Sequence, residues 1–109
     1  MTTLPGSTEY RKLLDEMWET HTKKNAGYAG IDNPDRWANF RLSEDLGIPA
    51  WKGALIRLQD KFIRVTNLIK NTKNEQVGES IRDTLIDLSA YALIIVCLLD
   101  ELENKKEKK

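Results

Sequence analysis

The feature that most constrains the fold is a set of acidic residues inside the most apolar segment of the chain. Residues 77–102 read VGESIRDTLIDLSAYALIIVCLLDEL, in which Glu79, Asp83 and Asp87 recur every four residues. At about 100° per residue these acids share one face of a helix, here called the acidic stripe. Burying an ionised carboxylate without a cation, a metal or hydrogen-bond donors costs several kcal/mol. The acidic stripe is therefore either a neutralised structural network or a binding site.

Chain length and charge narrow the class of protein. The 109 residues suit one domain, and 17 basic residues balance 17 acidic ones, which leaves no net charge to draw a nucleic-acid polymer or a membrane. The longest apolar stretch, residues 85–99, contains an acid and is shorter than the roughly 20 residues of a membrane span. The N-terminus shows no basic region followed by an apolar one. We expect a cytoplasmic protein.

Apolar periodicity predicts an all-α, four-helix bundle-like fold. The expected helices cover residues 7–27, 35–46, 50–71 and 76–102. A long irregular loop, NAGYAGIDNPDRW, should follow the first helix because it contains Gly27, Gly30 and Pro34. One domain would span residues 1–104, and residues 105–109 would form a charged, flexible tail.

The third expected helix has an apolar face and a charged face. The apolar face contains Leu55, Leu58, Phe62, Val65 and Ile69, and the charged face contains Arg57, Asp60, Lys61 and Arg64. If the third and fourth helices pack antiparallel across the short turn NTKNE, the charged face meets the acidic stripe. Opposite charges would then lie against each other.

This pairing has two interpretations. One is a salt-bridge network that fixes how the helices align. The other is a polar site in which Arg57, Lys61 and Arg64 hold phosphates by charge-assisted hydrogen bonds. In such a site the acidic stripe would hold Mg²⁺, which prefers oxygen ligands and keeps several waters.

Several separated motifs resemble a small phage and bacterial family, nucleotide modification associated domain 1. The similarity covers about residues 23–96, through KNAGYAGIDNPDRWANFRLSEDLGI, ALIRLQDKFIRVTNLI and VGESIRDTLIDLSAYALIIV. The matching positions are Lys24, Asn25, Tyr28, Asn39, Phe40, Arg57, Asp60, Lys61, Arg64, Asn67, Glu79, Asp83 and Asp87. The resemblance implies a nucleotide-handling protein that binds a nucleotide or a nucleotide-derived small molecule.

The loop after the first helix also carries candidate ligand residues. Gly27 and Gly30 let the backbone approach a ligand closely, and Tyr28 and Trp37 offer ring faces on which a base can stack. Three asparagines can read a base edge or a hydroxyl: Asn25, Asn33 and Asn39. The alternative is that Trp37 and Phe40 anchor a short helix to the core. Tyr28 is the aromatic residue that we assign to a ligand.

A more distant similarity is to the all-helical MazG-type nucleoside triphosphate pyrophosphatases, which bind Mg²⁺ through an ExxE pair and an ExxD pair. Glu16 and Glu19 form an ExxE pair here, but Glu79 and Asp83 form ExxxD and lie far from it. Three functions therefore remain open. They are a Mg²⁺-dependent pyrophosphatase, a non-catalytic sponge for nucleotide immune signals such as cyclic dinucleotides or ADP-ribose-type molecules, and a purely structural oligomer. A phage-encoded protein would act in the host cytoplasm.

The last expected helix is apolar on nearly every side between Leu88 and Leu99. Three short partner helices cannot easily cover that much apolar surface. We therefore expect a homo-oligomer, most simply a dimer. Cys97 lies in the same segment and is expected to be a small core residue.

Overall fold

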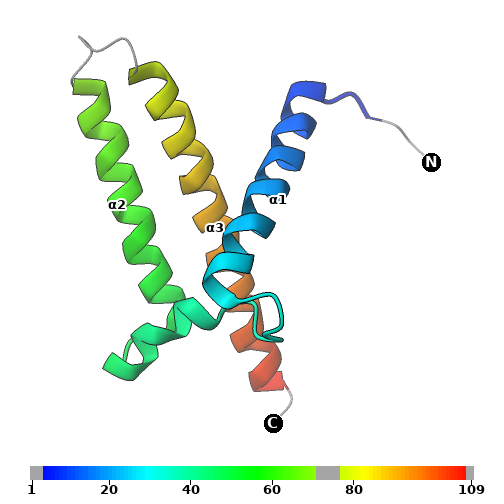
Figure 1. The fold of residues 1–109 in the computed structure, drawn as a ribbon, viewed down its shortest axis with the longest axis vertical. Coiled ribbons are helices and arrows are strands. Elements are labelled where there is room, and N and C mark those ends of the chain that lie inside the picture. The colour runs from blue at the N-terminus through cyan, green and yellow to red at the C-terminus, as the bar shows by residue number, and fades with distance from the viewer. Residues whose placement is uncertain (1–3, 71–76, 108–109) are drawn as a thin grey trace. The chain divides into compact units, whose positions relative to one another are not determined.

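The computed structural model describes residues 4–70 and 77–107, with side chains described over 4–70 and 81–106. These residues form α1 (Thr8–Ala29), the 3₁₀ helix η1 (Ala38–Leu46), α2 (Ala50–Lys70) and α3 (Val77–Glu107), and no strand occurs among them (Figure 1). The all-α prediction is confirmed. The chain divides into two compact units between Arg36 and Trp37, and each is described by itself.

Helix α1 begins where the sequence predicts and ends later. Ser7 is its N-cap, because the Ser7 hydroxyl accepts a hydrogen bond from the backbone N–H of Tyr10 at 3.1 Å. The helix continues to Ala29, past the expected end between residues 25 and 27. It stops at Gly30, whose φ of 89° is accessible mainly to glycine and whose N–H donates to the carbonyl of Ala26 at 3.2 Å. The loop is accordingly shorter than predicted.

The second expected helix is a 3₁₀ helix, and it begins at Ala38 rather than at residue 35. Gly47 ends it in the left-handed conformation, with φ 77°, and donates its N–H to the carbonyl of Glu44 at 3.0 Å. The chain then turns directly into α2. The carbonyl of Pro49 accepts the N–H groups of Lys52 and Gly53 at 3.0 and 3.1 Å, which closes the first turn of that helix.

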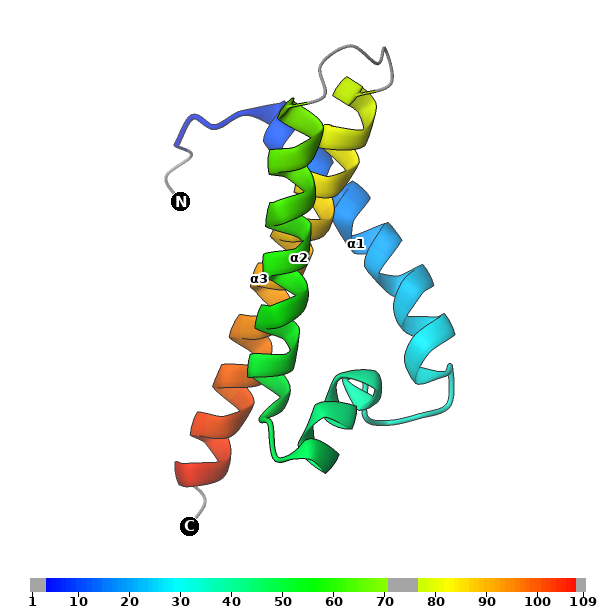
Figure 2. The same cartoon turned by 90° about the vertical axis from the view of Figure 1, so that its left-hand side faces the viewer.

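Helices α2 and α3 run antiparallel side by side, as both views show (Figures 1 and 2). The turn predicted at residues 71–75 lies outside the described residues. The core between the helices is small, with buried Ala50, Ala54, Ile95 and Leu98. Because Ala54 is fully buried and has only a methyl side chain, the two helices can approach each other closely there.

The C-terminal part of α3 continues beyond its predicted end. The helix reaches Glu107, so residues 105–107 of the expected tail are helical. Lys105 lies 3.2 Å from Glu101, and Lys106 lies 3.8 Å from Glu103. Ion pairs at these three- and four-residue spacings stabilise an exposed helix. They explain why α3 extends further than apolar periodicity predicts.

Much of the apolar surface is exposed. Leu55, Phe62 and Ile69, expected on the apolar face of α2, are all exposed, whereas Leu58 is half-buried. Cys97 is exposed, so its predicted place in the core is wrong. On α2 the fully buried residue of the helix pair is therefore a small alanine, and the long apolar residues of the core, Ile95 and Leu98, come from α3. No described helix is both long enough and apolar enough to cross a membrane.

Candidate functional site: a basic face on α2

Three basic side chains lie along one side of α2. Arg57, Lys61 and Arg64 are spaced by four and three residues, the spacing that places side chains on one helical face. The Arg57 guanidinium carbon lies 5.7 Å from the centre of the Phe40 ring. The Arg64 Nε donates to the Thr84 hydroxyl at 3.3 Å. Each arginine is therefore positioned by a neutral partner from another helix.

Lys61 has a different partner. Its Nζ lies 3.4 Å from Oδ2 of Asp87 on α3, and both side chains are about one third exposed. This pair is one of the contacts that the sequence predicts between the basic face and the acidic stripe. Because a carboxylate already balances its charge, Lys61 is less available to an anion than its two neighbours are.

Arg57 and Arg64 have no carboxylate partner among the described residues, and both are exposed. A cation–π contact and a hydrogen bond to a hydroxyl orient a guanidinium without neutralising its charge. The two residues are seven positions apart, which corresponds to about 10 Å along a helix. Their long side chains can therefore reach one anion that carries more than one phosphoryl group.

An aromatic cluster lies beneath Arg57. The Phe40 ring meets the Trp37 ring at 6.2 Å and 62° and the Tyr91 ring at 6.2 Å and 83°, both edge-to-face arrangements. Trp37 and Phe40 pack against the core, as one of the two interpretations of these residues requires. Phe40 thereby serves two purposes, because it anchors η1 and also supports the Arg57 guanidinium.

Asn39 belongs to the same short helix. Its Oδ1 is buried and has no hydrogen-bond partner among the described residues. A buried acceptor without a donor costs about 1–3 kcal/mol. Because this oxygen is buried, a ligand donor does not reach it in this structure, and the ligand role that the sequence gives Asn39 stays a prediction.

The predicted metal ligands do not lie together as the three basic residues of α2 do. The Asp83 side chain is 67% exposed, and its Oδ1 lies 3.9 Å from Arg82. Asp87 pairs with Lys61 one turn further along, and the Glu79 side chain lies outside the described residues. Within the described part of the chain, no three His, Cys, Asp or Glu side chains are grouped so that they could hold a metal ion. The Mg²⁺ site at Glu79, Asp83 and Asp87 stays a prediction, as does the ligand role of the exposed Asp60.

The candidate residues of the first unit lie near the end of α1. Tyr28 is 70% exposed and Lys24 is also exposed. The Asn25 amide is already engaged, because it donates to the carbonyl of Arg36 at 2.7 Å and accepts from the Arg36 Nε at 2.7 Å. Arg36 also donates to the carbonyl of Gly30 at 2.7 Å. Sequence reasoning missed Arg36, although an arginine at the end of a glycine- and asparagine-rich loop is well suited to bind its carbonyls.

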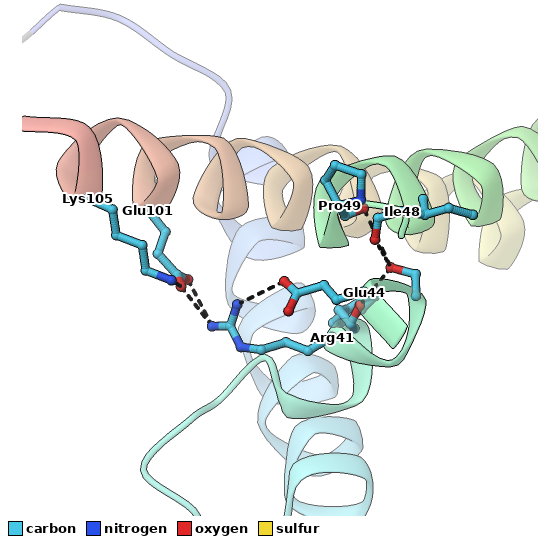
Figure 3. Close-up of polar contacts among 8 residues, drawn as sticks. Arg41, Glu44, Ile48, Pro49, Glu101 and Lys105 are labelled. Carbon is cyan, nitrogen blue, oxygen red and sulfur yellow. Dashed lines mark hydrogen bonds and ion pairs between the residues drawn. The ribbon is translucent and has the colours of Figure 1, made fainter. Parts of the chain in front are cut away.

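An ion pair connects η1 to the C-terminal part of α3 (Figure 3). The Arg41 guanidinium donates from one nitrogen to both oxygens of Glu101, at 2.8 and 3.1 Å. Glu44 lies 3.9 Å from Arg41, and Lys105 lies 3.2 Å from Glu101. The group holds the short helix that carries Asn39 and Phe40 against α3. No local sequence pattern predicts this pair, because its members are 60 residues apart.

No protein-family model matches the chain, and comparisons with curated proteins and with solved structures found no significant match. The resemblance to the nucleotide modification associated family therefore stays a prediction from the quoted motifs.

Proposed function

We propose that this chain binds a nucleotide or a nucleotide-derived small molecule through its phosphates, which contact Arg57 and Arg64. The observation that carries the proposal is the pair of exposed guanidinium groups on one side of α2, each oriented by a neutral partner. Guanidinium groups bind phosphate oxygens in a bidentate manner by charge-assisted hydrogen bonds. Because Phe40 and Thr84 already orient these side chains, less conformational entropy is lost on binding.

The ligand is bound without turnover in this proposal, as a nucleotide sponge requires. The contacts of Arg57 with Phe40 and of Arg64 with Thr84 orient the two cations for binding, and neither contact involves a catalytic group. Lys61 would add a third cation once Asp87 shares it with the ligand. The resemblance adds Lys24, Asn25, Tyr28 and Asn39 as residues that assist recognition. The apolar surface of the last helix adds a homo-oligomer to the proposal, and the cytoplasm is its proposed location.

Mg²⁺-dependent pyrophosphate hydrolysis is the second candidate function. It draws support from Asp83 and Asp87, which are one turn apart on α3, with Asp87 3.4 Å from a lysine of the basic face. Carboxylates so placed would hold Mg²⁺ beside the phosphates and lower the barrier to attack by water.

A ligand panel tests both candidates. The purified protein is incubated with nucleoside triphosphates, cyclic dinucleotides and ADP-ribose-type molecules, with and without Mg²⁺, and both free ligand and products are followed by chromatography. Stoichiometric depletion, with intact ligand recovered on denaturation, supports the sponge. Pyrophosphate release that requires Mg²⁺ supports the enzyme instead. No depletion and no product across the panel would refute nucleotide binding and favour a structural role.

Variants then locate the site. Replacing Arg57 or Arg64 by Ala should each lower affinity for the ligand that the panel identifies by a factor of about 10 to 100, since each removes hydrogen bonds to a charged group. Lys52→Ala is the matched control, because Lys52 is an exposed cation of α2 that lies over the Trp51 ring instead. Equal losses in all three variants would point to unspecific charge attraction and contradict the assigned site.

A further inference from the structure

The outward side of α3 carries an apolar stripe that the described residues leave exposed. Leu85 and Val96 are 47% and 51% exposed, and Leu99 is 39% exposed. Ala92 and Ser89 lie between them and are exposed too. On a helix, Leu98 points well away from this side, whereas the buried Ile95 lies beside it, three residues after Ala92 and four before Leu99. The stripe therefore borders the packing between α2 and α3, and its own residues stay exposed.

Charged residues of opposite sign close the two ends of this stripe. Arg82 precedes Leu85 by three residues, and Glu103 follows Leu99 by four. The full set alternates in steps of three and four: Arg82, Leu85, Ser89, Ala92, Val96, Leu99 and Glu103. We call these seven residues the outer stripe. Steps of three and four keep residues on one seam between two long helices, as in coiled coils.

We propose that the outer stripe is the interface of a homodimer in which the α3 helices of two copies pack antiparallel. An antiparallel pair brings Arg82 of each copy to the end of the seam where the other copy has Glu103. Both ends then join opposite charges. A parallel pair would instead place arginine against arginine and glutamate against glutamate, which is unfavourable.

The middle of the outer stripe suits a two-fold axis. Ala92 lies nearest the axis and is small, so two helices can approach closely there, while Ser89 faces Val96 of the other copy and Leu85 faces Leu99. The one hydroxyl of the stripe does not oppose burial, because Ser89 Oγ donates to the carbonyl of Leu85 at 2.9 Å. From Arg82 to Glu103 the seam is about 33 Å long at 1.5 Å per residue.

The exposed apolar side of α2 is less suited to a second copy. It contains Leu55, Phe62 and Ile69, with Lys52 and Lys70 near its ends. An antiparallel pairing of this side with itself would bring Lys52 of one copy near Lys70 of the other. Both charges are positive, so the ends would repel, and the charge pattern therefore selects α3.

The first experiment measures molar mass by light scattering or sedimentation over a range of concentrations. The unmodified chain should form a dimer, and Val96→Lys should make it monomeric by placing two ammonium groups in the seam. Ile63→Lys is the matched control, because Ile63 on α2 is exposed to a similar extent, 56%. Circular dichroism confirms that each variant keeps its helical content. A dimer that survives Val96→Lys, or one that Ile63→Lys dissociates instead, would overturn the proposal.

The second experiment tests the direction of the helices. Arg82→Glu and Glu103→Arg should each weaken the dimer by about two- to tenfold, the range typical of exposed ion pairs. The double variant should restore the dimer. In a parallel dimer each position faces its own copy, so each single variant would replace one like-charge pair by another and leave association nearly unchanged, and that result would overturn the antiparallel arrangement. A monomer at every concentration, destabilised by Val96→Lys, would show that a segment of the same chain covers the stripe and would refute the proposal.

Discussion

Asn25 and Arg36 bind each other reciprocally across the loop that follows α1. The Asn25 side-chain amide donates to the carbonyl of Arg36, and the Arg36 Nε donates to Oδ1 of Asn25, each at 2.7 Å. The same guanidinium donates from one nitrogen to the carbonyls of Gly30 and Asn33, at 2.7 and 2.8 Å. The loop is therefore closed around one arginine, and Asn25 is its helical anchor.

Replacing Asn25 by Ala should lower the free energy of unfolding of the first unit by about 2 kcal/mol, because a half-buried guanidinium loses its neutral acceptor. Urea denaturation measures the change, and limited proteolysis should show faster cleavage between Gly30 and Arg36. Asn67→Ala is the control, since it makes the same change at an exposed helical position of α2. The role of Asn25 as an anchor is wrong if the two variants are equally stable.

The end of α1 shows what the sequence could and could not predict. Ser7 predicts the start of the helix correctly, because its side chain caps the first turn and this signal is local in the sequence. Gly27 suggested a helix end, but the helix continues through it to Ala29. The difference arises because Asn25 bonds a residue eleven positions away, and only the folded chain brings Arg36 there.

Gly53 lies where η1 contacts the first turns of α2. A Cβ added at this position would lie 2.8 Å from Ser43 Oγ and 3.0 Å from Ser43 Cβ. Ser43 cannot easily move away, because its hydroxyl donates to the carbonyl of Ile48 at 3.0 Å. Gly53→Ala should therefore destabilise the second unit by about 1–3 kcal/mol, as overpacking does, despite the helix propensity that alanine adds.

Gly27→Ala provides the matched control for Gly53→Ala. Gly27 is also helical, but a Cβ there would meet nothing within 4 Å. That variant should be neutral or more stable by up to about 1 kcal/mol. Thermal unfolding of both proteins gives the comparison. Gains of equal size in the two variants would contradict the close approach of Ser43 to Gly53.

The ion pair between Arg41 and Glu101 should be worth more than the other ion pairs of α3. Both side chains are 28% exposed, and one Arg41 nitrogen donates to both carboxylate oxygens (Figure 3). Glu101→Gln should cost about 1–2 kcal/mol of unfolding free energy, with a smaller cost in high salt. Glu103→Gln, which alters a carboxylate 68% exposed and 3.8 Å from Lys106, should cost less than about 0.5 kcal/mol. Urea denaturation of the two variants would disprove this ranking if their costs were equal.

The faces of α2 were predictable in part. Helical spacing correctly separates Leu55 and Phe62 from Arg57 and Arg64, because that separation depends only on the geometry of one helix. Which face is buried depends on the partner helix. In the structure, Ala54, the half-buried Leu58 and the Lys61–Asp87 pair lie against α3, so α2 covers only some of its large apolar residues there. The sequence predicted that the charges meet, but not that Phe62 stays exposed.

The pKa of Glu9 lies below its ordinary value of 4.5. Its own backbone N–H lowers the pKa most, and the hydroxyls of Ser7 and Thr8 donate to Oε2 at 3.0 and 3.4 Å. A carboxyl whose folded-state pKa is lowered adds stability above about pH 4.5, and this stability is lost as the pH falls through the lowered value. Ser7→Ala should raise the pKa of Glu9 toward 4.5, and Thr8→Ala should raise it less. NMR titration of the Glu9 carboxyl tests this order, and a larger shift with Thr8→Ala would refute it.

Asp87→Asn separates direct phosphate binding from binding through a metal. Asp87 lies 3.4 Å from Lys61 and also repels any phosphate near the basic face. If the phosphates contact Arg57, Lys61 and Arg64 directly, the variant should bind inorganic pyrophosphate about two- to tenfold more tightly without Mg²⁺, because one competing charge is gone.

If Asp87 instead holds Mg²⁺, the same variant should lose Mg²⁺-dependent binding or turnover, so the two mechanisms predict changes of opposite sign. Calorimetric titration with and without Mg²⁺ measures both, and Asp45→Asn in η1, an exposed acid, controls for the change in net charge. Unchanged binding together with a lower unfolding temperature would show that Asp87 only holds α2 against α3 through Lys61. In that case only Arg57 and Arg64 would bind the phosphates.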